Sequence, residues 1–113
     1  MKVSEAIKNA PVLDGKVTTI EGLFIMKMDL GYIIDSKIDI ETPAMAIEVK
    51  APDLKKRLLT TVPAFGGSQY SYCNEAKITG VVAVAHESKF PCLISNITEI
   101  EIFMHGEVFK LSL

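Results

Sequence analysis

The sequence is poor in residues that mark several protein classes. Its 113 residues include no tryptophan, only two cysteines and a single arginine, Arg57. Two cysteines, Cys73 and Cys92, are too few for a disulfide framework in a chain of this length. One bridge between them and two reduced thiols are the alternatives, and we expect the thiols. The 14 acidic residues outnumber the 12 basic ones, which argues against a protein that depends on phosphate contacts, although a local basic groove fits this balance.

Long apolar runs are also missing. No segment approaches the roughly 20 apolar residues that span a membrane, and the opening MKVSEAIKN has no stretch of signal-peptide length. We therefore expect a cytoplasmic protein without a membrane partner. The 49% hydrophobic content is enough for one domain over residues 1–113 that buries a core of its own.

The pattern that is present indicates strands. Residues 15–27, GKVTTIEGLFIMK, are rich in β-branched and aromatic side chains, which fit a pleated, half-buried surface. Residues 76–85, AKITGVVAVA, repeat that composition. Gly22 and Gly80 lie inside these runs, where a glycine marks a bulge, a bend or a close backbone approach. We favour the bends of a small closed barrel over the alternative of two weak points in an ordinary sheet.

The other elements follow from periodicity and from turn residues. A short helix is expected over residues 3–9, with Ser4 as its N-cap, and a longer one over residues 52–62, where Leu54, Leu58 and Val62 form an apolar stripe. Strands are expected from Tyr32, over residues 38–41, 44–50 and 97–103, and, at an edge, over residues 107–113. We expect Asp35, Asp39 and Glu41 on an exposed stripe. Residues 64–74 and 87–96 are predicted to be long loops.

The order of three strands, a helix and two more strands resembles the OB-fold, a mainly β, five-stranded Greek-key barrel. The resemblance covers residues 15–103 and rests on this order, on Gly22 and Gly80, and on the segments GKVTTIEG, GYIID and AKITGVV. It implies that the helix over residues 52–62 plugs the barrel. OB-folds bind oligonucleotides, oligosaccharides and proteins, so the resemblance leaves the class of ligand open.

The resemblance also implies a binding face across the second and third strands, flanked by two loops. Single-strand binders place aromatic rings there for base stacking and lysines for phosphates. Mapped on this sequence, that face offers two rings and three cations, namely Tyr32, Phe90, Lys27, Lys50 and Lys89. The other interpretation makes Tyr32 a strand-surface residue and Phe90 a core residue.

A second candidate surface is the predicted loop over residues 64–74, which carries three of the eight aromatic residues, Phe65, Tyr70 and Tyr72. Tyrosine suits protein interfaces because it combines a large ring with a polar end. Alternatively, these rings fold back over the barrel. A protein partner or a homodimer would use this loop or an exposed strand edge.

No pattern for catalysis or metal binding emerges. His86 and His105 have no partner at ligand spacing, and Cys73 and Cys92 form no CxxC pair. Glycines 66 and 67 lack the lysine of a phosphate loop. We therefore predict a non-enzymatic binding module without a cofactor or metal. Single-stranded DNA or RNA is the first expected ligand, and a protein-interaction module is the alternative.

Overall fold

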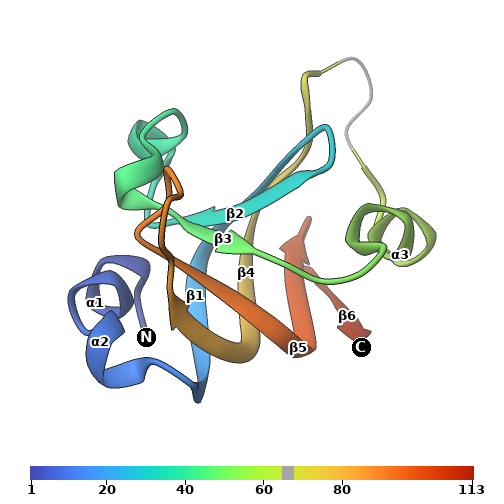
Figure 1. The fold of residues 1–113 in the computed structure, drawn as a ribbon. Coiled ribbons are helices and arrows are strands. Elements are labelled where there is room, and N and C mark those ends of the chain that lie inside the picture. Colours follow the sequence, from blue (N-terminus) through green and yellow to red (C-terminus); the bar gives the residue numbers. More distant parts are fainter. Residues whose placement is uncertain (65–67) are drawn as a thin grey trace.

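A computed structural model describes residues 1–64 and 68–113 of the chain (Figure 1). The described part is mainly β, with six strands and three α-helices. The strands are β1 (Lys16–Lys27), β2 (Leu30–Ile34), β3 (Ile47–Val49), β4 (Tyr70–Val84), β5 (Cys92–Met104) and β6 (Glu107–Ser112). The helices are α1 (Val3–Lys8), α2 (Ala10–Leu13) and α3 (Leu54–Thr61), with two short 3₁₀ turns, η1 (Lys37–Asp39) and η2 (Pro43–Met45).

The strands form one sheet in the order β3-β2-β1-β4-β5-β6. Each neighbouring pair in this order is antiparallel, and β3 also pairs in parallel with β5. The pairings therefore run in a closed circuit from β1 through β2, β3, β5 and β4 back to β1. β6 lies outside this circuit and pairs with residues 99–104, the C-terminal half of β5.

The two mid-strand glycines lie where neighbouring backbones come close. A Cβ on Gly22 would stand 2.4 Å from the carbonyl oxygen of Ile34, and one on Gly80 would stand 2.7 Å from that of Ser95. Gly80 also coincides with a break in the register between β4 and β5. Both glycines therefore lie at close backbone approaches, one of the three features that a glycine inside a strand indicates.

The main core lies inside the strand circuit. It is built from alternate residues of the strands, such as Phe24, Ile78 and Ile100, and is closed by helix residues that include Val3 and Leu58. α1 and α2 lie together beside one end of β1, and α3 lies away from them on the other side of the sheet (Figure 1). The predicted stripe of α3 is confirmed, because Leu54, Leu58 and Val62 are all buried.

Several expected boundaries were wrong. Residues 38–41 are not a strand: η1 occupies residues 37–39, and no residue between β2 and β3 pairs with the sheet. β3 is limited to Ile47–Val49 because η2 takes up the preceding residues. β4 and β5 begin earlier than predicted, at Tyr70 and Cys92, so both loops are shorter. The expected edge strand near the end of the chain is confirmed as β6.

The N-terminal helix is capped differently from the prediction. Ser4 is not its N-cap, because the helix begins at Val3. The carboxylate of Asp35 instead accepts hydrogen bonds from the backbone amides of Val3 and Ser4, at 2.9 and 3.0 Å. Asp35 therefore caps a helix rather than joining an exposed strand stripe, and it ties the end of β2 to the start of the chain.

Candidate functional site

The face expected to bind a ligand is covered by the chain itself. On the outer side of β1 and β2, a second small core forms from residues that point away from the main core, namely Ile25, Tyr32, Ile34, Ala46 and Phe90. Part of its cover is the connection from β2 to β3, which contributes Ile40 and Ala46. This face is therefore closed where the resemblance to OB-folds places a binding surface.

Tyr32 and Phe90 lie together, but inside this second core. Their ring centroids are 6.0 Å apart, and the two residues are only 6% and 4% exposed. The Tyr32 hydroxyl donates a 2.6 Å hydrogen bond to the carbonyl oxygen of Ile40. Burial, with smaller contributions from Tyr70, Glu41 and Cys73, raises the pKa of Tyr32 to about 12. The phenol therefore stays protonated at neutral pH and anchors the covering segment.

The three expected lysines do not form one cationic track. The Nζ of Lys27 lies 6.0 Å from the Tyr70 ring centroid, and that of Lys89 lies 5.5 Å from the Phe90 ring centroid. Lys50 lines a separate open groove of about 740 Å³ beside α3 that neither other lysine enters. Acidic residues such as Glu48 and Asp53 share that groove, so it has no surplus of positive charge.

The aromatic residues of the predicted interaction loop are also separated. Tyr72 is fully buried in β4, where its hydroxyl donates a 2.7 Å hydrogen bond to the carbonyl oxygen of Val62. The Tyr72 side chain therefore has no surface to offer a partner, and it packs 6.3 Å from Phe24 between ring centroids. Tyr70 begins β4 and is half-buried. Phe65 lies outside the described residues.

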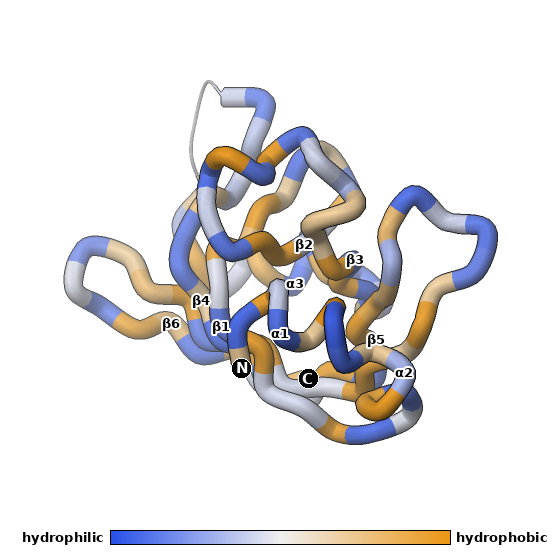
Figure 2. Tube along the Cα trace, turned by 90° about the vertical axis from the view of Figure 1, so that its left-hand side faces the viewer, coloured by the Kyte–Doolittle hydropathy of each residue, from blue (hydrophilic) through white to orange (hydrophobic). Residues whose placement is uncertain are grey.

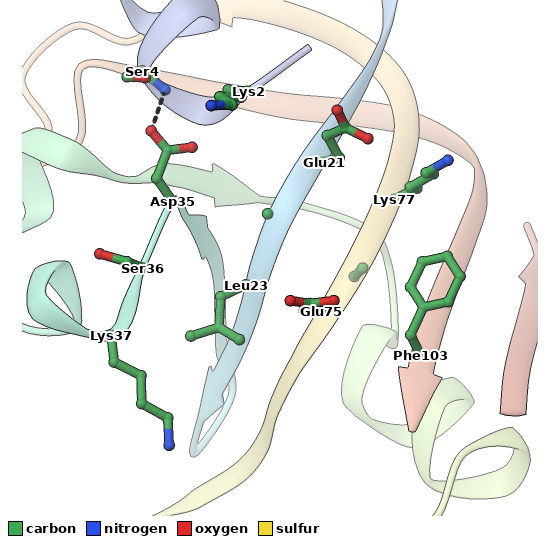
Figure 3. Close-up of a pocket in the computed structure, with 12 residues that line it drawn as sticks. Lys2, Ser4, Glu21, Leu23, Asp35, Ser36, Lys37, Glu75, Lys77 and Phe103 are labelled. Atoms are coloured by element: carbon green, nitrogen blue, oxygen red, sulfur yellow. Dashed lines mark hydrogen bonds between the residues drawn. The ribbon is translucent and has the colours of Figure 1, made fainter. Parts of the chain in front are cut away.

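An open groove of about 770 Å³ lies elsewhere, on the outer face of β1, β4 and β5 (Figure 3). Leu23 and Phe103 contribute apolar surface to it. Six charged residues, three of each sign, also line it: Lys2, Glu21, Asp35, Lys37, Glu75 and Lys77. Figure 3 shows Glu21 and Lys77 on neighbouring strands and Asp35 bonded to the start of α1.

The groove combines two apolar side chains with equal numbers of acidic and basic residues, so it has no surplus of positive charge for binding phosphates. Sequence reasoning did not find it. The outward alternation of Glu21 and Leu23 along β1 was visible, but only the register shows that Lys77 and Glu75 lie directly opposite them.

The described residues offer little reactive chemistry. They contain no cluster of three or more His, Cys, Asp or Glu side chains placed to hold a metal ion. Cys73 and Cys92 are both free thiols, as expected from the sequence. Cys92 is fully buried, and burial raises the pKa of its thiol to about 11, so it stays in the unreactive thiol form.

Comparison with known proteins found no match to a family model, a curated protein or a solved structure. None of the helices in the described residues has the length and apolar character needed to cross a membrane.

Proposed function

We propose that this chain is a non-enzymatic, OB-fold-like domain that binds a protein partner through the outer face of β1, β4, β5 and β6. The OB-like architecture is supported by the strand circuit β1-β2-β3-β5-β4 and by α3 between β3 and β4. The protein-binding function rests on the open groove lined by Leu23 and Phe103. Both side chains are half-buried and line this open groove.

The same geometry weakens the support for single-stranded nucleic acid. Stacking needs exposed rings, but Tyr32 and Phe90 are packed against each other beneath the connection from β2 to β3. The net charge of −2 and the mixed charges of both grooves also disfavour a polyanion. A cytoplasmic location remains the expectation for this binding function.

Site-specific photo-crosslinking tests the proposal. A benzophenone amino acid replaces Lys77, which lines the groove, or Lys56, which lies on α3 in the other groove. Both lysines are exposed, so the two variants are matched. In cells that express the chain natively, we expect a discrete protein adduct from position 77 and none from position 56. Equal adducts from both positions, or adducts to nucleic acid, would contradict the proposal.

A further inference from the structure

Four neighbouring strands carry a row of alternating charges on the outer face. The register places Glu21 of β1 opposite Lys77 of β4, Lys77 opposite Glu101 of β5, and Glu101 opposite Lys110 of β6. Opposite charges directly across two strands stabilise their pairing. The row therefore reads acidic, basic, acidic, basic, and it ends on a lysine at the last strand.

In the part of the chain that the structure describes, β6 is the end of the sheet with a single strand neighbour, and α3 is the one helix that packs near it. At the opposite end, β3 is closed by its parallel pairing with β5, whereas β6 has β5 as its single strand partner. The β5–β6 hairpin also projects from the body of the domain (Figure 2). An exposed edge presents unpaired amide and carbonyl groups to which another strand can add.

The neighbouring outward position on β6 is apolar. Val108 lies directly opposite Phe103 and is 55% exposed. Phe103 also lines the groove, so the two residues join the groove to the edge. Along β6, the outer side thus presents an apolar position at Val108 and a basic one at Lys110.

We propose that an extended segment of another protein adds to β6 as an antiparallel strand, with an acidic residue opposite Lys110. Two positions after this acidic residue, towards the C-terminus of the segment, an apolar residue lies opposite Val108. The segment continues the alternation of charge by one strand and covers the exposed valine. This inference rests on the proposed function, because it specifies how a protein partner docks on the same face.

Lys110 has the capacity for a second carboxylate. Its Nζ lies 3.2 Å from an Oε2 atom of Glu99, and its side chain remains 57% exposed. An ammonium group has three donors, so the contact with Glu99 leaves donors for a residue on an added strand.

A second copy of this chain does not fit the edge. In a two-fold antiparallel pair of β6 strands, two directly opposite residues point to the same face of the sheet. Residues on one face of β6 are all even-numbered or all odd-numbered, so the two opposite residue numbers add up to an even value. Centring the pair on Phe109 places Val108 opposite Lys110, and centring it on Lys110 places two lysines face to face. Glu107 points to the other side of the sheet and cannot meet Lys110. No such register supplies the acidic residue.

Peptide titration of the ¹⁵N-labelled full chain tests the proposal by NMR. The probe is the acetylated and amidated peptide Lys-Thr-Val-Glu-Ile-Val-Thr-Lys, whose control carries Lys in place of Glu. We expect the Glu peptide to shift the amide signals of β6 and to bind about fivefold more tightly than its control, which corresponds to a cross-strand ion pair. Lys110→Glu should reverse this order, whereas Lys56→Glu, with the same change of net charge, should keep it.

Three results would overturn the proposal: equal affinity for the two peptides, an unchanged order in Lys110→Glu, or β6 signals that do not respond. Concentration-dependent β6 shifts without peptide would instead show self-association and would also overturn it. If a partner still crosslinks at position 77 after any of these results, the proposed function stands and only the docking mode fails.

Discussion

The carboxylate of Asp35, at the end of β2, accepts a 2.9 Å hydrogen bond from the backbone amide of Val3 at the start of α1. A second bond, from the amide of Ser4, completes the cap. The two partners are 31 to 32 residues apart in the chain, so this contact fixes the N-terminal helix against the sheet. Val3 itself is fully buried in the main core.

Replacing this carboxylate should loosen the N-terminal helix. We expect Asp35→Asn to lower the free energy of unfolding by about 1 kcal/mol, because the amide side chain offers one acceptor fewer and loses the favourable charge at the helix N-terminus. Glu75→Gln removes an exposed carboxylate that caps no helix and serves as the matched control. Urea unfolding measures both, and equal stabilities of the two variants would contradict the capping role.

The hydroxyl of Tyr32 should anchor the segment that covers the second core. Tyr32→Phe keeps the ring but leaves the carbonyl oxygen of Ile40 without its donor, so we expect a loss of about 1 kcal/mol in the free energy of unfolding. Hydrogen exchange of the amides in residues 36–46 should accelerate at the same time. Tyr70→Phe removes a hydroxyl from a half-buried ring at the edge of this core and should leave that exchange unchanged.

Glycine-to-alanine substitutions should separate steric from conformational effects. Gly22→Ala places its Cβ 2.4 Å from the carbonyl oxygen of Ile34, which rigid backbone cannot accommodate, so we expect destabilisation by about 3 kcal/mol or more. Gly106→Ala meets no atom within 4 Å and bears only the strain of a φ of +77°, about 1 kcal/mol. Thermal unfolding ranks the two variants, and the reverse order would contradict the close approach of β1 and β2.

Alkaline pH should destabilise the fold through two buried acids. Burial raises the pKa of Cys92 from 9.0 to about 11 and that of Tyr32 from 10.0 to about 12. Above pH 9 the unfolded chain therefore releases protons that the folded chain retains, so stability is complete below pH 9 and falls between pH 9 and 12. We expect Cys92→Ala to flatten the first part of this fall, between pH 9 and 11. An unchanged slope would show that the thiol does not titrate as its burial implies.

Much of the architecture was predictable because local pattern and tertiary structure agree. The β-branched run of residues 16–27 forms β1, Leu54 and Leu58 form the buried side of α3, and Val62 is buried directly after the helix. Gly22 signalled a close approach because glycine is the one residue without a Cβ. The closure of the circuit by β3 and β5 is a long-range pairing that no single segment encodes.

The site was less predictable because its determinants are contacts between distant residues. Ile38 and Ile40 alternate with acidic residues as a strand would, yet the segment forms η1 and packs Ile40 against the second core, where its carbonyl oxygen accepts the Tyr32 hydrogen bond. Local pattern cannot distinguish these outcomes. Likewise, Tyr32 and Phe90 pack against each other, and the side chains that cover them depend on the path of residues 36–46.

The closed second core decides between the two expected ligands, because it buries the rings on which nucleic-acid bases would stack. Fluorescence anisotropy with a short mixed-sequence single-stranded DNA and its RNA counterpart, at low and physiological salt, measures whether those rings are available. We predict no binding to either oligonucleotide, even at low salt. Salt-sensitive binding that Tyr32→Ala and Lys50→Ala abolish, while both variants remain folded by circular dichroism, would show that this face is open to bases and would favour nucleic acid as the ligand.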